Sequence, residues 1–140
     1  MEFEYSCGNV EPCTAFPAGP RTCRPIIAVR IQRNGIWTDP IPAVVDTGSD
    51  YCVFYGRLAK DLGLVLEDLP SAPAQGIGKA DLRIAPVILD TGCFGQWEIR
   101  AAFAENDIDF ALLGYIGFLE KFAFSTNPKE ATFTLEKVDA

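Results

Sequence analysis

The stretch Ala43-Val44-Val45-Asp46-Thr47-Gly48-Ser49 is the part of the chain from which the fold can be worked out. Its apolar beginning predicts a buried strand, and the small polar residues that follow predict a tight turn. The turn would hold the Asp46 carboxylate at the end of the strand, with room beside it for a second chain and a water. Acid–base catalysis by a pair of carboxylates needs two of them, and this turn supplies only one. The sequence therefore poses the question of where a second aspartate lies.

Asp-Thr-Gly occurs a second time, at Asp90, in a different context. Residues 82–89 and 94–103 have the pattern of two long strands, and an Asp-Thr-Gly between them is ordinary for the tip of a hairpin. Asp46 and Asp90 are 44 residues apart, which is too few for two lobes that each need their own strands. We therefore interpret Asp90 as a structural turn and Asp46 as the candidate catalytic residue.

Strand patterns dominate the rest of the chain. Alternating apolar and polar residues predict a strand at 27–32, and Asn34-Gly35 predicts a tight hairpin that returns towards Asp46. The other elements expected are strands at 51–54 and 111–113, helical turns at 56–62 and 116–122, and a closing hairpin at 123–135. No repeat or long linker divides them, so the sequence predicts one mainly β domain over residues 25–140.

Residues 1–24 are expected to form an irregular N-terminal arm. Pro12, Pro17 and Pro20 interrupt any long element, because proline fixes the backbone and lacks an N–H donor. Two interpretations stay open at this point. The arm is either a loose segment or a contributor of a strand to a subunit interface.

Charge and composition exclude several classes of function. The 140 residues carry 12 basic and 19 acidic side chains, a net charge of -7, which argues against nucleic acid or an anionic membrane as a partner. The absence of histidine rules out a Ser-His or Cys-His nucleophile and a histidine-bound metal. No apolar run approaches the roughly 20 residues of a membrane span, and the acidic N-terminus is unlike a signal peptide. We therefore expect a cytoplasmic protein.

Five cysteines without a Cys-x-x-Cys pair do not resemble a disulfide framework. We expect free thiols in a reducing compartment. Cys7, Cys13 and Cys23 crowd the N-terminal arm, which leaves a thiol or metal protein as an alternative. Zinc would need a fourth ligand from elsewhere in the chain, so we expect no metal site.

Four pieces of the sequence together resemble the retropepsin family of single-domain aspartic peptidases, which act as dimers. They are residues 44–50 (Val-Val-Asp-Thr-Gly-Ser-Asp), 58–64 (Leu-Ala-Lys-Asp-Leu-Gly-Leu), 76–78 (Gly-Ile-Gly) and 112–114 (Leu-Leu-Gly). The resemblance covers about residues 25–136 and is nearer to cellular and bacterial members than to viral ones. It implies an all-β fold, a closed acid-protease barrel or sandwich with one or two short helices. It also implies cleavage of protein or peptide substrates by a homodimer, without a cofactor.

The resemblance implies a role for each residue of the turn. Asp46 from each of two subunits would hold one catalytic water. Thr47 would hydrogen-bond across the dimer, Gly48 would let the backbone approach closely, and Ser49 would bond the outer carboxylate oxygen. Two carboxylates within a few Å keep one proton between them, so one acts as base towards water and the other polarises the scissile carbonyl.

Other matching residues would support this site or cover it. Leu113 and Gly114 would pack beneath the turn, and a flap over the peptide would consist of Gly76, Ile77, Gly78 and Lys79. Two departures from the family are visible. Tyr115 and Ile116 stand where many members carry a basic residue that ties the dimer together, and Lys79 replaces a common glycine. These departures leave open an alternative function, a catalytically silent module for peptide binding or dimerisation.

Overall fold

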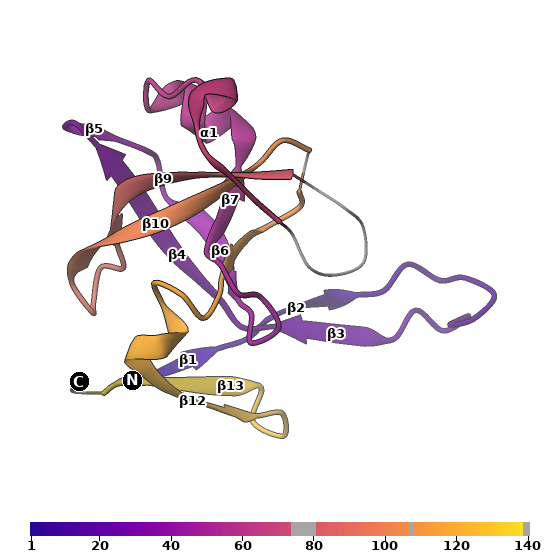
Figure 1. Ribbon diagram of the computed structural model, residues 1–140. Helices are drawn as coiled ribbons and strands as arrows, with labels where there is room; N and C mark the ends of the chain where they lie inside the picture. Colours follow the sequence, from indigo (N-terminus) through magenta and orange to yellow (C-terminus); the bar gives the residue numbers. More distant parts are fainter. Residues whose placement is uncertain (74–80, 107, 139–140) are drawn as a thin grey trace.

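The computed structural model describes residues 1–73, 81–106 and 108–138, and its centre is a closed β barrel (Figure 1). The strands of this sheet are β4 (Ile26–Arg33), β5 (Ile36–Trp37), β6 (Ile41–Val45), β7 (Val53–Tyr55), β8 (Ser71–Pro73), β9 (Asp81–Asp90), β10 (Gln96–Ala104) and β11 (Ala111–Leu113). The ring follows the order β4-β6-β11-β7-β10-β9 and closes where β9 pairs with β4. The fold predicted from the sequence, a closed β domain with a short helix, is confirmed.

Local sequence signals explain several of the connections. The hairpin between β4 and β5 turns at Asn34 and Gly35, whose positive φ angles of 52° and 81° suit the predicted two-residue turn. The helix α1 (Gly56–Asp61) is followed by Gly63, which has a φ of 77° and stops the helix as expected. The predicted turn at 116–122 is shorter, a 3-10 helix at Leu119–Lys121, and another 3-10 helix spans Leu66–Asp68. None of the helices in the described part of the chain has the length and apolar character to cross a membrane.

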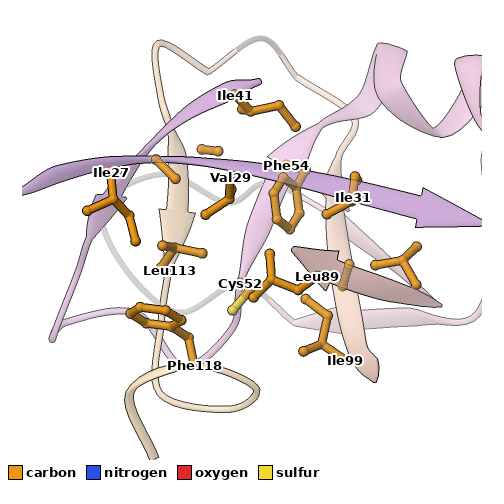
Figure 2. Packing of buried hydrophobic residues seen from close by; sticks show 14 of the residues in the cluster. Ile27, Val29, Ile31, Ile41, Cys52, Phe54, Leu89, Ile99, Leu113 and Phe118 are labelled. Atoms are coloured by element: carbon orange, nitrogen blue, oxygen red, sulfur yellow. The ribbon is translucent and has the colours of Figure 1, made fainter. Parts of the chain in front are cut away.

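The core fills the barrel with side chains from every strand of the ring (Figure 2). The alternation predicted for β4 is confirmed, because Ile27, Val29 and Ile31 are buried while their neighbours Ala28 and Arg30 are exposed. The largest fully buried side chains include Phe54, Phe103, Phe118, Leu89 and Leu113. β6, the strand that precedes Asp46, is therefore packed into a dense interior.

A three-stranded sheet below the barrel joins the two ends of the chain (Figure 1). Its strands are β1 (Glu2–Glu4), β13 (Thr132–Lys137) and β12 (Phe122–Asn127). Phe3 and Tyr5 stack on Phe133 with ring centroids 5.2 and 5.6 Å apart. The first five residues are therefore part of the folded body, which corrects the expectation of an irregular arm, although the boundary at residue 25 stays a prediction.

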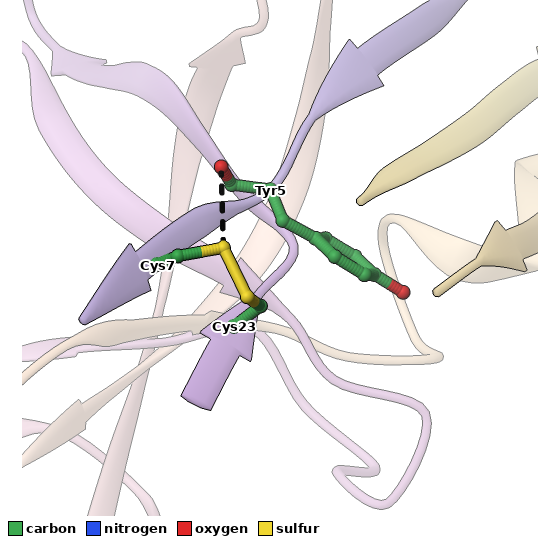
Figure 3. The surroundings of a disulfide bond; sticks show 3 residues. All are labelled: Tyr5, Cys7 and Cys23. Carbon is green, nitrogen blue, oxygen red and sulfur yellow. Dashed lines mark hydrogen bonds between the residues drawn. A yellow bond between two sulfur atoms is a disulfide. The ribbon is translucent and has the colours of Figure 1, made fainter. Parts of the chain in front are cut away.

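The rest of the arm forms a hairpin of β2 (Ser6–Asn9) and β3 (Arg21–Arg24), which projects away from the barrel (Figure 1). Cys7 lies directly opposite Cys23, and the two form a disulfide (Figure 3). The expectation that these thiols are free was wrong, because strand pairing brings together cysteines that 16 positions separate in the sequence. The disulfide also uses two of the three cysteines considered for a metal. Disulfides persist mainly in oxidising compartments, so this pair speaks against the cytoplasmic location, which stays a prediction.

Thiol labelling is expected to separate the five cysteines into three groups. Cys13 and Cys93 are exposed and should react fast, while Cys7 and Cys23 should react only after reduction. Cys52 is buried, and burial raises the pKa of its thiol to about 12, so it should react only after unfolding. Maleimide labelling at pH 8, counted by intact mass with and without reductant and denaturant, checks this order. Fast labelling of Cys52 in the folded protein would contradict the packing described here.

Candidate active site

Asp46 lies at the end of β6, on a turn that backbone hydrogen bonds hold in place. β6 runs parallel to β11, and the Asp46 N–H donates to the Leu113 carbonyl at 3.0 Å. The Gly48 N–H donates to Asp46 Oδ1 at 2.9 Å, and the Ser49 N–H donates to the Asp46 carbonyl at 3.2 Å. The half-buried carboxylate is thus fixed by its own turn and by the neighbouring strand. A fixed acid or base is what proton transfer at a defined position requires.

Gly114 brings the chain after β11 into close contact with this turn. A Cβ atom at this position would lie 2.5 Å from the Ser49 carbonyl oxygen and 2.8 Å from the Tyr51 carbonyl carbon. The contact is completed by the Tyr115 N–H, which donates to the Ser49 carbonyl at 2.9 Å. Leu113 and Gly114 therefore lie directly against the Asp46 turn, where the resemblance places them. Only glycine fits at position 114 without a shift of the backbone.

The other two predicted residues of the turn take different positions. The Ser49 hydroxyl donates to the Tyr51 carbonyl at 2.8 Å, which differs from the expected bond to the outer oxygen of Asp46. The acceptor is local, a backbone carbonyl two residues further along the chain. Thr47 is exposed, as is Gly48. The bond that Thr47 would make across a dimer stays a prediction.

An open hollow of about 540 Å³ lies beside Asp46. Its walls are formed by Arg24, Val44, Ile108, Asp109, Phe110 and Leu112. The Arg24 guanidinium lies over the Phe110 ring, 5.4 Å from its centroid. None of these walls was predicted as part of the site, because they come from three separate segments that only the folded barrel brings together. The lining of the hollow is mostly apolar, and Asp46 is one of its lining residues.

Asp90 forms a hairpin turn between β9 and β10, as predicted. Its Oδ1 accepts the Gly92 N–H at 2.9 Å, and its Oδ2 pairs with Arg30 Nη2 at 2.8 Å. The Gly92 hydrogen bond, and then the Arg30 guanidinium, lower the pKa of the Asp90 carboxyl below its ordinary value. In the strand register, Asp90 lies opposite Arg30 of β4, whereas Val44, two residues before Asp46, lies opposite Ile26 of β4. Four residues, about 13 Å of strand, separate these positions, so Asp90 does not complete a pair with Asp46.

Comparison with known proteins agrees with this geometry. A family model described as "Aspartyl protease" matches residues 27–115, which is more than half of the chain and includes both the Asp46 turn and Gly114. The chain belongs to this family of aspartyl proteases. The matched region leaves out the disulfide-linked hairpin and the C-terminal hairpin, so these are additions to what the family model describes.

Solved structures similar to this chain include two proteases. A retropepsin-like aspartic protease from Rickettsia conorii is similar with a TM-score of 0.55 and 18% sequence identity, over 91% of this chain and 97% of that one. EIAV protease, solved in complex with the inhibitor HBY-793, gives a TM-score of 0.45 and 24% identity, over 65% of this chain and 81% of that one. No curated protein matches the chain significantly. The predicted resemblance to retropepsin-like proteases is confirmed at the level of family and fold.

The flap predicted for this aspartyl protease lies outside the described residues. Gly76, Ile77, Gly78 and Lys79 fall in the gap between β8 and β9. Of the aromatic residues near the turn, Phe54 is fully buried in the core. Tyr55 faces a hollow beside α1 that does not include Asp46. The described part of the site therefore consists of the Asp46 turn, the Leu113–Gly114 support and the hollow next to them.

Proposed function

We propose that this aspartyl protease is a homodimeric endopeptidase in which Asp46 from each of two copies activates one water. The observation that carries the proposal is the rigid Asp46 turn, which supplies one carboxylate, while the second Asp-Thr-Gly of the chain is tied into a hairpin. Thr47 and Gly48 are exposed, which leaves the turn accessible to a second copy. A single chain therefore contributes half of the pair, and a two-fold dimer would contribute both halves.

The reaction follows from two carboxylates that share one proton. The ionised carboxylate takes a proton from the water as its oxygen attacks the scissile carbonyl carbon. The protonated carboxylate gives its proton to the carbonyl oxygen, so the tetrahedral intermediate is neutral. Proton transfer to the amide nitrogen then lets the C–N bond break and releases an acid and an amine. Each step uses the Asp46 pair and water alone, so no cofactor is required.

The hollow beside Asp46 supports a peptide as substrate. The hollow is open, and Val44, Ile108, Phe110 and Leu112 give it an apolar lining that suits an apolar side chain next to the cleaved bond. An extended peptide could lie along it with its backbone near the carboxylate. The silent peptide-binding module would use the same hollow without turnover.

Cleavage of a diverse peptide library tests the proposal. We expect cutting that is strongest at mildly acidic pH, where the carboxylate pair holds one proton, and a decline towards neutral and alkaline pH as that proton is lost. The products, identified by mass spectrometry from pH 3.5 to 8, also give the side-chain preference. Peptides that bind but stay intact at every pH would support the silent module, and a rate that keeps rising above neutrality would contradict the paired-carboxylate mechanism.

Activity per mole of chain is expected to fall on dilution. Because each copy holds half of the pair, the active fraction should follow the fraction of dimer. Initial rates measured over a wide range of protein concentrations should therefore coincide with the dimer fraction from analytical ultracentrifugation. Full activity in a sample that is strictly monomeric would overturn the dimeric mechanism.

A further inference from the structure

The hairpin of β2 and β3 has little besides its own pairing to keep it ordered. It forms a two-stranded sheet, and in the described part of the chain neither strand pairs with a third one. All four residues of β2 are exposed, and none of residues 6–24 adds a side chain to the buried core. A two-stranded hairpin alone is at best marginally stable in water. The order of this hairpin therefore depends on its crosslink, the disulfide between Cys7 and Cys23 (Figure 3).

Arg24, which directly follows Cys23, connects the hairpin to the candidate active site. Its guanidinium lies 5.4 Å from the centroid of the Phe110 ring, and both residues line the hollow beside Asp46. The ion pairs between described residues do not include Arg24, so none of the carboxylates described here fixes its charge in place. The position of this cation therefore depends on the backbone of β3 and on the contact with the Phe110 ring.

The backbone of Arg24 is attached on both sides. On the C-terminal side, the Pro25 carbonyl accepts the Val45 N–H at 2.8 Å, which ties it to the barrel. On the N-terminal side, Arg24 belongs to the last pair of the β2–β3 ladder, and the pair next to it is Cys7 with Cys23. Reduction of the disulfide keeps the first attachment and weakens the second. Cys7 is exposed and Cys23 half-buried, so a thiol reductant can reach the bond.

The charges around the hollow make Arg24 important for an acidic substrate. Asp46 and Asp109 line the same hollow, and their negative charges repel a glutamate or aspartate side chain that enters it. Arg24 is the basic residue of this lining and offsets that repulsion. A peptide with an acidic side chain beside the cleaved bond therefore needs Arg24 in place, whereas a neutral peptide does not.

We propose that the Cys7–Cys23 disulfide is a redox control of substrate choice. In the oxidised protein it holds Arg24 at the hollow, and peptides with an acidic side chain next to the cleaved bond are accepted. In the reduced protein the hairpin loosens, Arg24 is no longer held there, and these peptides bind more weakly. This control rests on the proposed function, since it concerns the peptide that Asp46 would cut.

The reductant in this control is a dithiol. One of its thiolates attacks a sulfur of the disulfide, which forms a mixed disulfide and releases the other cysteine as a thiolate. The second thiolate of the reductant then displaces the remaining cysteine. Cys7 and Cys23 gain two electrons and two protons and end as thiols, while the dithiol loses them and ends as a disulfide.

The test compares two peptides that are identical except for Glu or Gln next to the cleaved bond. It is run at pH 6, where a peptide glutamate, with a pKa of about 4.3, is ionised. The ratio of kcat/KM for the Glu peptide to that for the Gln peptide is measured for the oxidised protein and after reduction with dithiothreitol. We expect reduction to lower this ratio about threefold or more, mainly through KM of the Glu peptide, which is the scale of one partly exposed charge pair. For the Gln peptide, kcat/KM should stay within about twofold.

Three variants show which group carries the effect. Cys7→Ser combined with Cys23→Ser should have the low ratio with and without reductant. Cys13→Ser combined with Cys93→Ser keeps the disulfide and should respond like the wild type. Arg24→Gln should have the low ratio in both redox states, because the hairpin then has no charge to place. Thermal unfolding checks that each variant is folded.

Hydrogen exchange gives a readout that does not depend on activity. Amides of residues 6–24 should exchange faster after reduction, while those of β4 in the barrel should not change. A hairpin that exchanges equally in both states would overturn the proposal. So would a peptide ratio that reduction leaves unchanged, or one that reduction lowers as much in the variant without Cys7 and Cys23.

Peptide binding separates this proposal from the proposed function. A chain that binds both peptides and cuts neither would count against the proposed function alone, and the ratio of the two dissociation constants then takes the place of the kinetic ratio. A chain that binds neither peptide in either redox state would overturn both.

Discussion

Asp46→Asn is expected to lower kcat/KM for peptide cleavage by about 1,000-fold or more, the scale of a lost acid–base pair. An amide cannot take a proton from water, so a dimer of this variant has no base at the site. The change is nearly isosteric, and the amide oxygen can still accept the 2.9 Å hydrogen bond from the Gly48 N–H. The variant should therefore fold and dimerise like the wild type, which is checked by thermal unfolding and sedimentation.

Asp90→Asn is the matched control, because it makes the same chemical change in the same tripeptide. Asp90 holds a hairpin through the Gly92 N–H and an ion pair with Arg30. Loss of the Asp90 charge should weaken that turn and leave kcat/KM within about twofold of the wild-type value, since Asp90 lies at a different position along β4 from the Asp46 turn. Equal losses of activity in both variants would contradict the assignment of the catalytic role to Asp46.

Mixing subunits gives a further test of the shared site. When wild-type and Asp46→Asn chains are mixed in equal amounts and allowed to exchange, about one quarter of the dimers carry two wild-type copies by random pairing. If both Asp46 carboxylates are needed, activity should fall to about half of that expected from the wild-type chains alone. Activity that stays proportional to the wild-type chains would mean that one Asp46 is sufficient.

The parts of the molecule that the sequence predicted correctly are those set by short-range rules. A two-residue hairpin turn requires positive φ angles, and Asn34-Gly35 adopts them readily. This turn therefore depends on its own two residues and not on the position of the flanking strands in the barrel. Asp90 lies between two alternating strands, and Gly63 has the positive φ that ends α1. The Asp46 turn belongs to the same group, because an apolar strand followed by small residues has few other conformations.

The features that the sequence did not predict depend on contacts between distant segments. Cys7 and Cys23 face each other only because β2 pairs with β3 in one register, and a shift of one residue would separate them. The walls of the hollow come from β3, β6, β11 and the segment before β11, and no local pattern predicts that these segments meet around one hollow. The Ser49 hydroxyl donates to the carbonyl of Tyr51, two residues further along the chain. Serine hydroxyls often bond to nearby backbone groups, and the spacing between Ser49 and Asp46 alone did not predict this acceptor.

Gly114→Ala is expected to destabilise the fold by about 3 kcal/mol, at the upper end for an overpacked buried site. The added methyl group would lie 2.5 Å from the Ser49 carbonyl oxygen, and the atoms it meets are backbone, which cannot turn aside as a side chain can. Relief requires the Asp46 turn and the chain after β11 to move apart. The melting temperature should fall by about 10 °C for a chain of this size, as measured by differential scanning calorimetry.

Gly8→Ala is the matched control for this variant, because an added Cβ at Gly8 meets nothing within 4 Å. It should change stability by less than about 0.5 kcal/mol. Activity separates the roles of the two positions at the site. Gly114→Ala should lose activity even at temperatures where it stays folded, since proton transfer depends on the placement of Asp46 to within about 1 Å. A Gly114→Ala protein with wild-type stability and full activity would show that the turn does not depend on this close contact, and the support assigned to Leu113 and Gly114 would be wrong.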